Sequence, residues 1–169
     1  RFCIAKNGST ATIFVDGDDW AGVIRAANDL GDDVRKVTGV ASRVDIQSTA
    51  DVLPSSILVG TIGKSRIIDR LIKQKKIDVK KVRDQWESYL IDVVDGHLVI
   101  AGSDKRGTIY GIYDISERIG VSPWYWMADV PVRHQEELYY EGGTFIQPSP
   151  KVKYRGIFIN DEWPSFGTW

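Results

Sequence analysis

The sequence predicts an α/β (α+β) fold in which a mixed β-sheet is covered by about three helices. Short apolar runs of strand length alternate along the chain with segments whose apolar residues recur at helical spacing. Two adjacent apolar runs, YLIDVV and HLVIA, flank Asp95 and Gly96, and this dipeptide is typical of a tight antiparallel hairpin. A hairpin combined with strand-to-helix units predicts a sheet that contains both parallel and antiparallel neighbours.

Strand and helix patterns alternate in the first half of the chain. The run ATIFVD (11–16) predicts a buried strand, and apolar residues then recur at helical spacing from Trp20 until Gly39. The runs RVDIQ (43–47) and SILVG (56–60) predict two further strands. The apolar positions after them fit a second helix, which contains Ile67, Ile68, Leu71 and Ile72.

The second half adds further elements around the hairpin. A lysine-rich link follows the second helix, and a short helix is expected near 79–83. A third helix is expected over 104–119, and it ends at Gly120, where glycine permits a left-handed cap. Gly107 and Gly111 lie one turn apart on this helix, so we expect them to let the helix approach the sheet closely.

Composition limits the classes of function. The 169 residues carry a formal net charge of −1 with a pI near 6.2, which gives no reason to expect nucleic acid, an anionic membrane or another polyanion as partner. Cys3 is the only cysteine, and His97 and His134 are the only histidines, so neither a disulfide nor a metal site is expected. No apolar stretch approaches the roughly 18 residues of a membrane span. A soluble chain is expected, with any secretion signal already removed.

The segment GTIGKS (60–65) has the position of a phosphate-binding loop, between a predicted strand and a predicted helix. That motif requires a glycine five residues before Gly63, and Leu58 stands there. We therefore expect only a strand-to-helix turn in which glycine supplies backbone freedom.

Four bulky residues gather directly after the third predicted helix, where a plain loop would be polar. The segment SPWYWMADVPV (122–132) contains Trp124, Tyr125, Trp126 and Met127. Such side chains cover either a sugar ring or a neighbouring domain. Packing against a neighbouring domain is favoured, because so large an apolar surface is rarely left exposed.

The end of the chain combines an apolar run with two carboxylates. Residues 154–159 have the pattern of a strand, and Asn160, Asp161 and Glu162 follow it with no turn residue between. This arrangement matches the first strand of a β/α barrel, in which catalytic groups lie at the carboxyl ends of the strands. One strand cannot close a barrel, so the remaining strands would have to come from further chain.

Two segments carry a resemblance to a known family. GSDKRGTIYGIYDISERIGVSPWYWMADVPV (102–132), followed by KYRGIFINDEWP (153–164), resembles the amino-terminal region of glycoside hydrolase family 115, the xylan α-glucuronidases. The hairpin, helix and aromatic loop resemble more loosely the domains that precede the barrels of family 67 α-glucuronidases and β-hexosaminidases. The resemblance implies a non-catalytic amino-terminal domain over residues 1–150 and the start of a truncated β/α-barrel domain over 151–169.

The same resemblance implies a function. The parent protein would be a longer, secreted or periplasmic enzyme that removes glucuronic acid or its 4-O-methyl ether from xylan, with inversion and without a redox cofactor. Its partners would be glucuronoxylan or xylo-oligosaccharides and the remaining catalytic domain of the same chain, with neither nucleic acid nor membrane. The chain by itself is expected to be inactive.

Asp161 is the candidate catalytic residue of this incomplete site. Inverting hydrolysis needs an acid and a base about 6.5–9.5 Å apart, and neighbouring strand residues point to opposite faces. Asp161 shares its face with Ile157 and Ile159, which would point into the barrel, so it is expected to face the sugar pocket. It could act as general base or as hydrogen-bond acceptor from a sugar hydroxyl. The candidate substrate-binding residues are Asn160, Glu162 and Trp163.

An alternative from another class makes the chain self-contained. In that interpretation, a carbohydrate-binding or scaffolding domain recognises polysaccharide through Trp124, Tyr125 and Trp126. The last residues favour the enzyme interpretation, because aromatic residues such as Trp163 and Trp169 need a further surface that buries them.

Overall fold

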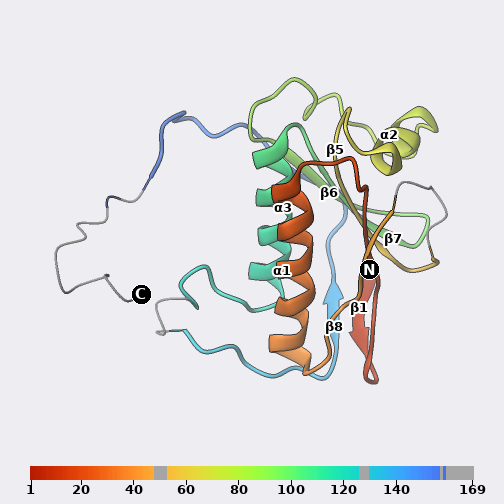
Figure 1. Ribbon diagram of the computed structural model, residues 1–169, viewed down its shortest axis with the longest axis vertical. Helices are drawn as coiled ribbons and strands as arrows, with labels where there is room; N and C mark the ends of the chain where they lie inside the picture. The colour runs from red at the N-terminus through yellow and green to blue at the C-terminus, as the bar shows by residue number, and fades with distance from the viewer. Residues whose placement is uncertain (48–52, 126–129, 157, 159–169) are drawn as a thin grey trace.

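The computed structural model describes residues 1–47, 53–125, 130–156 and 158. Within these residues the chain forms two β-sheets and three helices (Figure 1). The helices are α1 (Ala21–Thr38), α2 (Arg66–Lys73) and α3 (Lys105–Arg118). The strands are β1 (Phe2–Lys6), β2 (Ser9–Thr10), β3 (Ile13–Val15), β4 (Val44–Ile46), β5 (Ile57–Thr61), β6 (Tyr89–Val94), β7 (His97–Gly102), β8 (Leu138–Tyr140) and β9 (Phe145–Gln147).

The larger sheet has six strands in the order β4-β3-β5-β7-β6-β9. Strands β4, β3, β5 and β7 run parallel to one another, whereas β6 is antiparallel to both β7 and β9. A separate three-stranded antiparallel sheet has the order β2-β1-β8. The predicted fold class, a mixed sheet covered by about three helices, is confirmed.

Helices cover both faces of the six-stranded sheet. Alternate strand residues point to opposite faces, so Ile13 and Ile100 face α1 and α3, while Phe14 and Val99 face α2. In Figure 1, α1 and α3 stand side by side in front of the sheet, and α2 lies at the upper right. The larger apolar cluster lies between the sheet and the α1–α3 pair, and it also contains residues of β1 and β8.

The local signals read from the sequence form as expected. Strands β6 and β7 make the hairpin, and positive φ angles of 50° at Asp95 and 80° at Gly96 give its turn the primed conformation. Helix α1 is closed by Gly39, which has a φ of 83°. Helix α3 begins after Asp104, whose carboxylate accepts a 2.7 Å hydrogen bond from the Gly107 amide.

Two glycines of α3 permit a close approach between this helix and the sheet. A Cβ atom at Gly107 would lie 2.3 Å from the Ser88 carbonyl oxygen, and one at Gly111 would lie 2.8 Å from a methyl group of Ile100. Both distances are shorter than a carbon atom can tolerate, so the helix could not sit here with larger residues. The role predicted for these glycines is confirmed.

The short helix predicted near 79–83 is wrong. Only one turn forms there, because the Val82 and Arg83 amides both donate to the Val79 carbonyl, at 2.9 and 2.8 Å. The next residue, Asp84, has a φ of 62°, which takes the backbone out of the helical conformation. The buried side chains of Val79 and Val82 hold this turn on the α2 side of the sheet.

The strand predicted over 154–159 does not form in its described part. Residues 154–156 and 158 lie in no strand, and Tyr154 and Phe158 are 87% and 89% exposed. A strand needs the backbone of a neighbouring strand as its hydrogen-bond partner, and no strand among the described residues pairs with this segment. The alternation of inward and outward side chains expected for a strand therefore does not apply to these residues.

Candidate functional site

The predicted catalytic segment follows the described part of the chain. Asn160, Asp161, Glu162 and Trp163 lie outside the described residues, as does Trp126 of the aromatic loop. Their roles stay predictions. The structure does describe the segment that leads to the carboxylates and the first residues of the aromatic loop.

A buried carboxylate holds the carboxyl-terminal segment close to the start of α3. The Glu87 side chain, which is 7% exposed, forms ion pairs with Arg155 and, at 3.1 Å, with Arg106. The hydrogen bond to Glu87 raises the pKa of the Arg155 guanidinium. The Ser149 hydroxyl donates a 2.7 Å hydrogen bond to the Trp86 carbonyl. The chain is thus tied to the domain shortly before the predicted catalytic residues.

A hollow of about 530 Å³ lies on the α1–α3 side of the sheet, beside the aromatic loop. Its walls come from α1, β6, α3, β9 and the loop after α3, and they combine tyrosine rings with carboxylates. We call it the tyrosine hollow. Its tyrosine and acidic residues are Asp33, Tyr89, Tyr110, Tyr113, Asp114 and Glu117.

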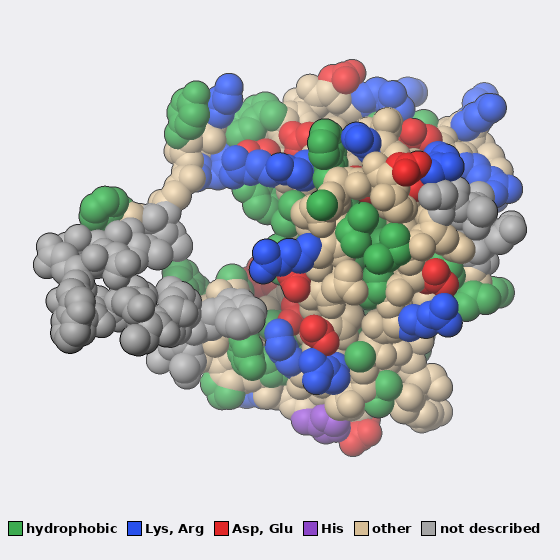
Figure 2. Space-filling view, in the orientation of Figure 1, with side chains coloured by type: hydrophobic (Ala, Val, Ile, Leu, Met, Phe, Trp, Pro, Cys, Tyr) green, Lys and Arg blue, Asp and Glu red, His purple; other side chains and the backbone are tan. Residues whose placement is uncertain are grey.

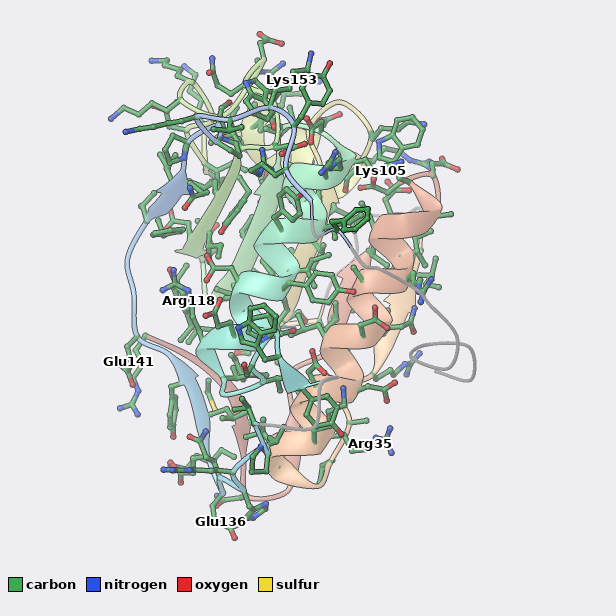
Figure 3. All side chains as sticks on the ribbon, turned by 90° about the vertical axis from the view of Figure 1, so that its left-hand side faces the viewer. Arg35, Lys105, Arg118, Glu136, Glu141 and Lys153 are labelled. Carbon is green, nitrogen blue, oxygen red and sulfur yellow. The ribbon has the colours of Figure 1, made fainter. Side chains whose placement is uncertain are left out.

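A network of three side chains forms one side of the tyrosine hollow. The Tyr89 hydroxyl donates a 2.8 Å hydrogen bond to Asp114, and Arg118 forms an ion pair with the same carboxylate. Burial, together with the bond to Asp114, raises the pKa of Tyr89 above its usual range. The bond to Asp114 also raises the pKa of the Arg118 guanidinium. Figure 3 shows Arg118 projecting from α3, and its guanidinium lies 4.6 Å from the centre of the Phe145 ring.

A second set of contacts joins α1 to α3 and to the aromatic loop. The Tyr113 hydroxyl donates a 2.7 Å hydrogen bond to Asp29 of α1. Burial, together with that bond, raises the pKa of Tyr113 to about 12. Asp33 lies 2.6 Å from the ammonium of Lys36, which in turn lies 4.9 Å from the centre of the Tyr125 ring. The aromatic loop is therefore held to α1 through Tyr125.

The contacts of Asp114 and Asp33 are not those of a catalytic pair. Glycoside hydrolysis needs one carboxyl group that stays protonated and a second that acts as base or nucleophile, whereas Asp114 and Asp33 are each paired with a cation. Trp124 follows two residues of the hollow, Ser122 and Pro123, and it is 56% exposed. An exposed indole beside tyrosine rings suits either a neighbouring domain or a sugar ring. Both predicted roles of the loop are compatible with this surface.

A second polar cluster lies at the carboxyl ends of β3 and β5, the edge at which open α/β sheets bind ligands. Buried Asp16 accepts a 2.8 Å hydrogen bond from the Arg66 amide, and Asp19 accepts one of 2.7 Å from the Thr61 amide. The Thr61 and Thr108 hydroxyls share a further bond of 2.8 Å. These carboxylates hold strands and helices together. Sequence reasoning missed this cluster, although aspartates directly after an apolar run were a visible signal.

The segment 60–65 is the strand-to-helix turn that the sequence predicts. A Cβ atom at Gly60 would lie 2.3 Å from the Ser65 hydroxyl oxygen, and Gly63 has a φ of 78°. The same Ser65 oxygen accepts a hydrogen bond from the Ile68 amide and so caps α2. Glycine is therefore needed here for close packing and for the backbone conformation.

Together the described residues form an α/β domain that carries an exposed surface of tyrosine rings, carboxylates and Trp124. Within the described ranges, no helix is both long enough and apolar enough to cross a bilayer. In the same part of the chain, no group of three or more His, Cys, Asp or Glu side chains is placed to hold a metal ion.

Comparisons with known proteins identify the family. Residues 6–115 match the family described as glycosyl hydrolase family 67 N-terminus, and the chain belongs to this family. A solved structure of a family GH115 4-O-methyl-α-glucuronidase with specificity for decorated arabinogalactans matches 94% of this chain, with 36% sequence identity and a TM-score of 0.77. The chain spans 20% of the length of that enzyme. No curated protein matches the chain. The predicted resemblance to the amino-terminal region of these glucuronidases is confirmed.

Proposed function

We propose that this chain is the amino-terminal part of a secreted or periplasmic α-glucuronidase. The parent enzyme removes glucuronic acid or its 4-O-methyl ether from xylan by inverting hydrolysis. The observation that carries this proposal is the 36% identity with a family GH115 4-O-methyl-α-glucuronidase over 94% of the chain. Because the chain spans 20% of that enzyme, the chemistry is assigned to the parent protein as a whole.

The pairing of these carboxylates supports the assignment of catalysis to parts of the parent enzyme other than the tyrosine hollow. Two carboxylates of the tyrosine hollow are already paired with cations, Asp114 with Arg118 and Asp33 with Lys36. The candidate catalytic group stays Asp161, with Asn160, Glu162 and Trp163 as candidate substrate-binding residues of the same segment. The second carboxylate of the mechanism belongs to another part of the parent enzyme, so the isolated chain is inactive.

Two polysaccharides are candidates for the substrate backbone from which the parent enzyme removes uronic acid. Xylan follows from the sequence resemblance, whereas the matched GH115 enzyme has specificity for decorated arabinogalactans. The full-length protein should be incubated with glucuronoxylan and, separately, with decorated arabinogalactan, and the released uronic acid measured by anion-exchange chromatography. Release from only one polymer identifies the backbone, and release from neither would overturn the proposal. Assay of the culture medium, the periplasm and the cytoplasm of the source cells tests secretion.

Stereochemistry gives an independent readout of the reaction. In inverting hydrolysis, water attacks the face of the sugar opposite the leaving group. Cleavage of an α linkage should therefore release the β-anomer first, before mutarotation mixes the two forms. A proton NMR time course detects this order, and an α-anomer as first product would contradict the inverting mechanism.

Replacement of the candidate catalytic carboxylate should affect rate far more than stability. In the full-length protein, Asp161→Ala is expected to lower kcat by about 10²-fold or more, because such a group acts mainly in the transition state. The unfolding free energy should change little. Glu136→Gln, which alters a carboxylate that is 90% exposed, is the matched control and should leave kcat unchanged. Near-normal kcat for Asp161→Ala would reduce Asp161 to a structural role.

A further inference from the structure

The segment that begins at the end of α2 concentrates positive charge. Residues 70–84 contain seven of the chain's 22 Lys and Arg residues but only two carboxylates, so they carry a formal charge of +5 while the rest of the chain carries −6. Figure 2 shows Lys and Arg side chains gathered at the upper right of this face, around the position of α2 in Figure 1. The whole-chain charge of −1, which gave no reason to expect a polyanion, therefore conceals one strongly basic segment.

Most of these cations have no carboxylate partner. Lys76 forms an ion pair with Asp95 of the hairpin turn. Five other exposed cations of the segment have no carboxylate within ion-pair distance among the described residues. They are Lys73, Lys75, Lys80, Lys81 and Arg83. Because like charges held close together repel one another, an anionic ligand that neutralises them would bind favourably.

Three of these cations border a hollow of about 730 Å³, which we call the basic hollow. The other side of its lining is aliphatic. The cations are Lys75, Lys80 and Arg83, and the aliphatic residues are Ile72, Ile77 and Val79. A ligand that combines a carboxylate with an apolar ring face matches the cations and the aliphatic residues of this lining, which also contains Asp78 and Asp84.

The backbone that carries the cations is fixed before any ligand binds. Ile77, Val79 and Val82 are buried on the α2 side of the sheet, which leaves the charged residues between them exposed. The Arg83 amide donates a 2.8 Å hydrogen bond to the Val79 carbonyl, which fixes the turn. A preformed backbone lowers the entropy that binding costs.

We propose that the basic hollow binds uronate carboxylates of an acidic polysaccharide. Arg83 can contact a carboxylate through two parallel hydrogen bonds, while Lys75 and Lys80 attract it as point charges. The aliphatic side of the hollow accepts the C–H face of a sugar ring. The inference rests on the proposed function in one respect, namely that the parent enzyme acts on a polysaccharide that carries uronates. Binding here holds the polymer while its uronate branches are removed.

The distribution of charge favours a polysaccharide over nucleic acid or an anionic membrane. Two carboxylates, Asp78 and Asp84, also line the basic hollow, and the chain outside residues 70–84 carries −6. With Lys75, Lys80 and Arg83, these two carboxylates leave the lining with a formal charge of +1, which is little for a DNA duplex, with one phosphate for about every 1.7 Å of its axis, or for a flat anionic bilayer. Single uronates that decorate a neutral backbone at intervals match this small excess of positive charge better.

Titration calorimetry on the full-length protein tests this site, in low-salt buffer because salt screens exposed charges. The variant Lys80→Gln/Arg83→Gln removes two border cations. The control Lys105→Gln/Arg133→Gln removes two exposed cations that do not line the hollow. We expect the hollow variant to weaken glucuronoxylan binding by about tenfold and the control by less than about twofold. Neutral xylan of matched length should bind all three proteins equally.

The outcomes separate the polysaccharide from other partners. Equal losses in the two variants, or no loss in either, would overturn the site. Arg83→Lys keeps the charge and should give an intermediate loss of glucuronoxylan binding, provided that the variant melts like the wild type. Suppose that a DNA duplex or vesicles rich in phosphatidylserine bind as tightly as glucuronoxylan and lose affinity in the same variant. The basic hollow would then be a general polyanion surface or a membrane surface, and the polysaccharide assignment would be wrong.

Hydrolysis of a short oligosaccharide distinguishes this inference from the proposed function. A substrate with a single uronate places that group at the point of cleavage, so the hollow variant should cleave it at the wild-type rate. No cleavage by the wild-type protein would overturn the proposed function. Normal cleavage combined with unchanged glucuronoxylan binding in the hollow variant would overturn only the role of the basic hollow.

Discussion

The two faces of the six-stranded sheet differ in how their charges are paired. On the α1–α3 face, Asp114 is matched by Arg118 and Tyr89, and Asp33 is matched by Lys36. On the α2 face, the border cations of the basic hollow have no carboxylate within ion-pair distance among the described residues. A surface whose charges are already paired loses little interaction energy when a neighbouring domain covers it. Unpaired cations, in contrast, gain most interaction energy from an anionic ligand. The first face therefore suits docking and the second suits an acidic polymer.

Helix length explains why the faces differ. Helices α1 and α3 have 18 and 14 residues, and their buried residues contribute to the larger apolar cluster. Helix α2 has only 8 residues, and three residues of the following segment complete the smaller cluster, namely Ile77, Val79 and Val82. An irregular segment that buries isolated residues must expose the residues between them, and here several of those are lysines. The architecture thus holds a group of cations at the surface on a fixed backbone.

The largest effect should come from a substitution that separates α3 from the sheet. Gly107→Ala would place a Cβ atom 2.3 Å from the Ser88 carbonyl oxygen, a backbone atom that cannot move aside cheaply. We expect the unfolding free energy to fall by about 1–3 kcal/mol, even though alanine favours helices over glycine. Gly143→Ala meets no atom within 4 Å and is the control, with a change below about 0.5 kcal/mol. Urea denaturation measures both, and equal stability of the two variants would contradict close packing on this face.

A smaller effect should appear at alkaline pH, and it should arise from the tyrosines of the α1–α3 face. The pKa of Tyr113 is raised from 10.0 to about 12, so between these values the folded state keeps a proton that the unfolded state has lost. The stability that Tyr113 contributes is therefore complete below pH 10 and is lost as the pH rises towards 12. The raised pKa of Tyr89 acts in the same direction.

Urea denaturation at several pH values above 9 tests this prediction. In Tyr113→Phe the unfolding free energy should fall less steeply with rising pH, because the phenylalanine side chain has no proton to lose. Tyr154→Phe alters a residue that is 87% exposed and should keep the wild-type slope. Identical slopes for the wild type and Tyr113→Phe would show that the contact with Asp29 does not stabilise this face.

The sequence predicted the elements whose signals are local. Helical spacing between Trp20 and Gly39 and the Asp95-Gly96 turn were sufficient for α1 and for the hairpin. Strands β8 and β9 have only three residues each, too few to show alternation, and they exist because distant strands pair with them. Strand β2 pairs with neighbouring β1 across Asn7-Gly8, a local hairpin signal that the sequence prediction missed. The helix expected near 79–83 failed because one helical turn and a longer helix share the same apolar spacing.

The candidate sites divide in the same way. The aromatic loop and the segment with Asp161 stood out because their unusual residues are consecutive in the sequence. The tyrosine hollow was not predicted, because its lining joins α1, β6, α3 and β9, which only the fold brings together. The lysine-rich link was visible, but its meaning depended on which lysines find a carboxylate in space. Whole-chain net charge concealed that difference.

The smallest effect is expected at the aromatic loop, if that loop is a docking surface. Trp124 is 56% exposed, so Trp124→Ala should change the unfolding free energy of the isolated chain by less than about 0.5 kcal/mol. In the full-length protein the same change should lower Tm, because a contact between domains is lost, while KM for glucuronoxylan barely changes. Trp20→Ala is the control. It removes a tryptophan that is 43% exposed and lies 4.3 Å from Lys64, outside the loop, and it should leave Tm of the full-length protein unchanged.

Fluorescence decides between docking and sugar stacking at Trp124. A docking surface predicts that xylo-oligosaccharides barely change the tryptophan fluorescence of the isolated chain. A sugar ring laid on the indole would change the solvation of the indole and quench its emission in a saturable way. Quenching that is abolished by Trp124→Ala and kept in Trp20→Ala would overturn the docking interpretation. Both faces would then bind polysaccharide, and salt would separate them, because screening weakens contacts through cations and leaves stacking on aromatic rings almost unchanged.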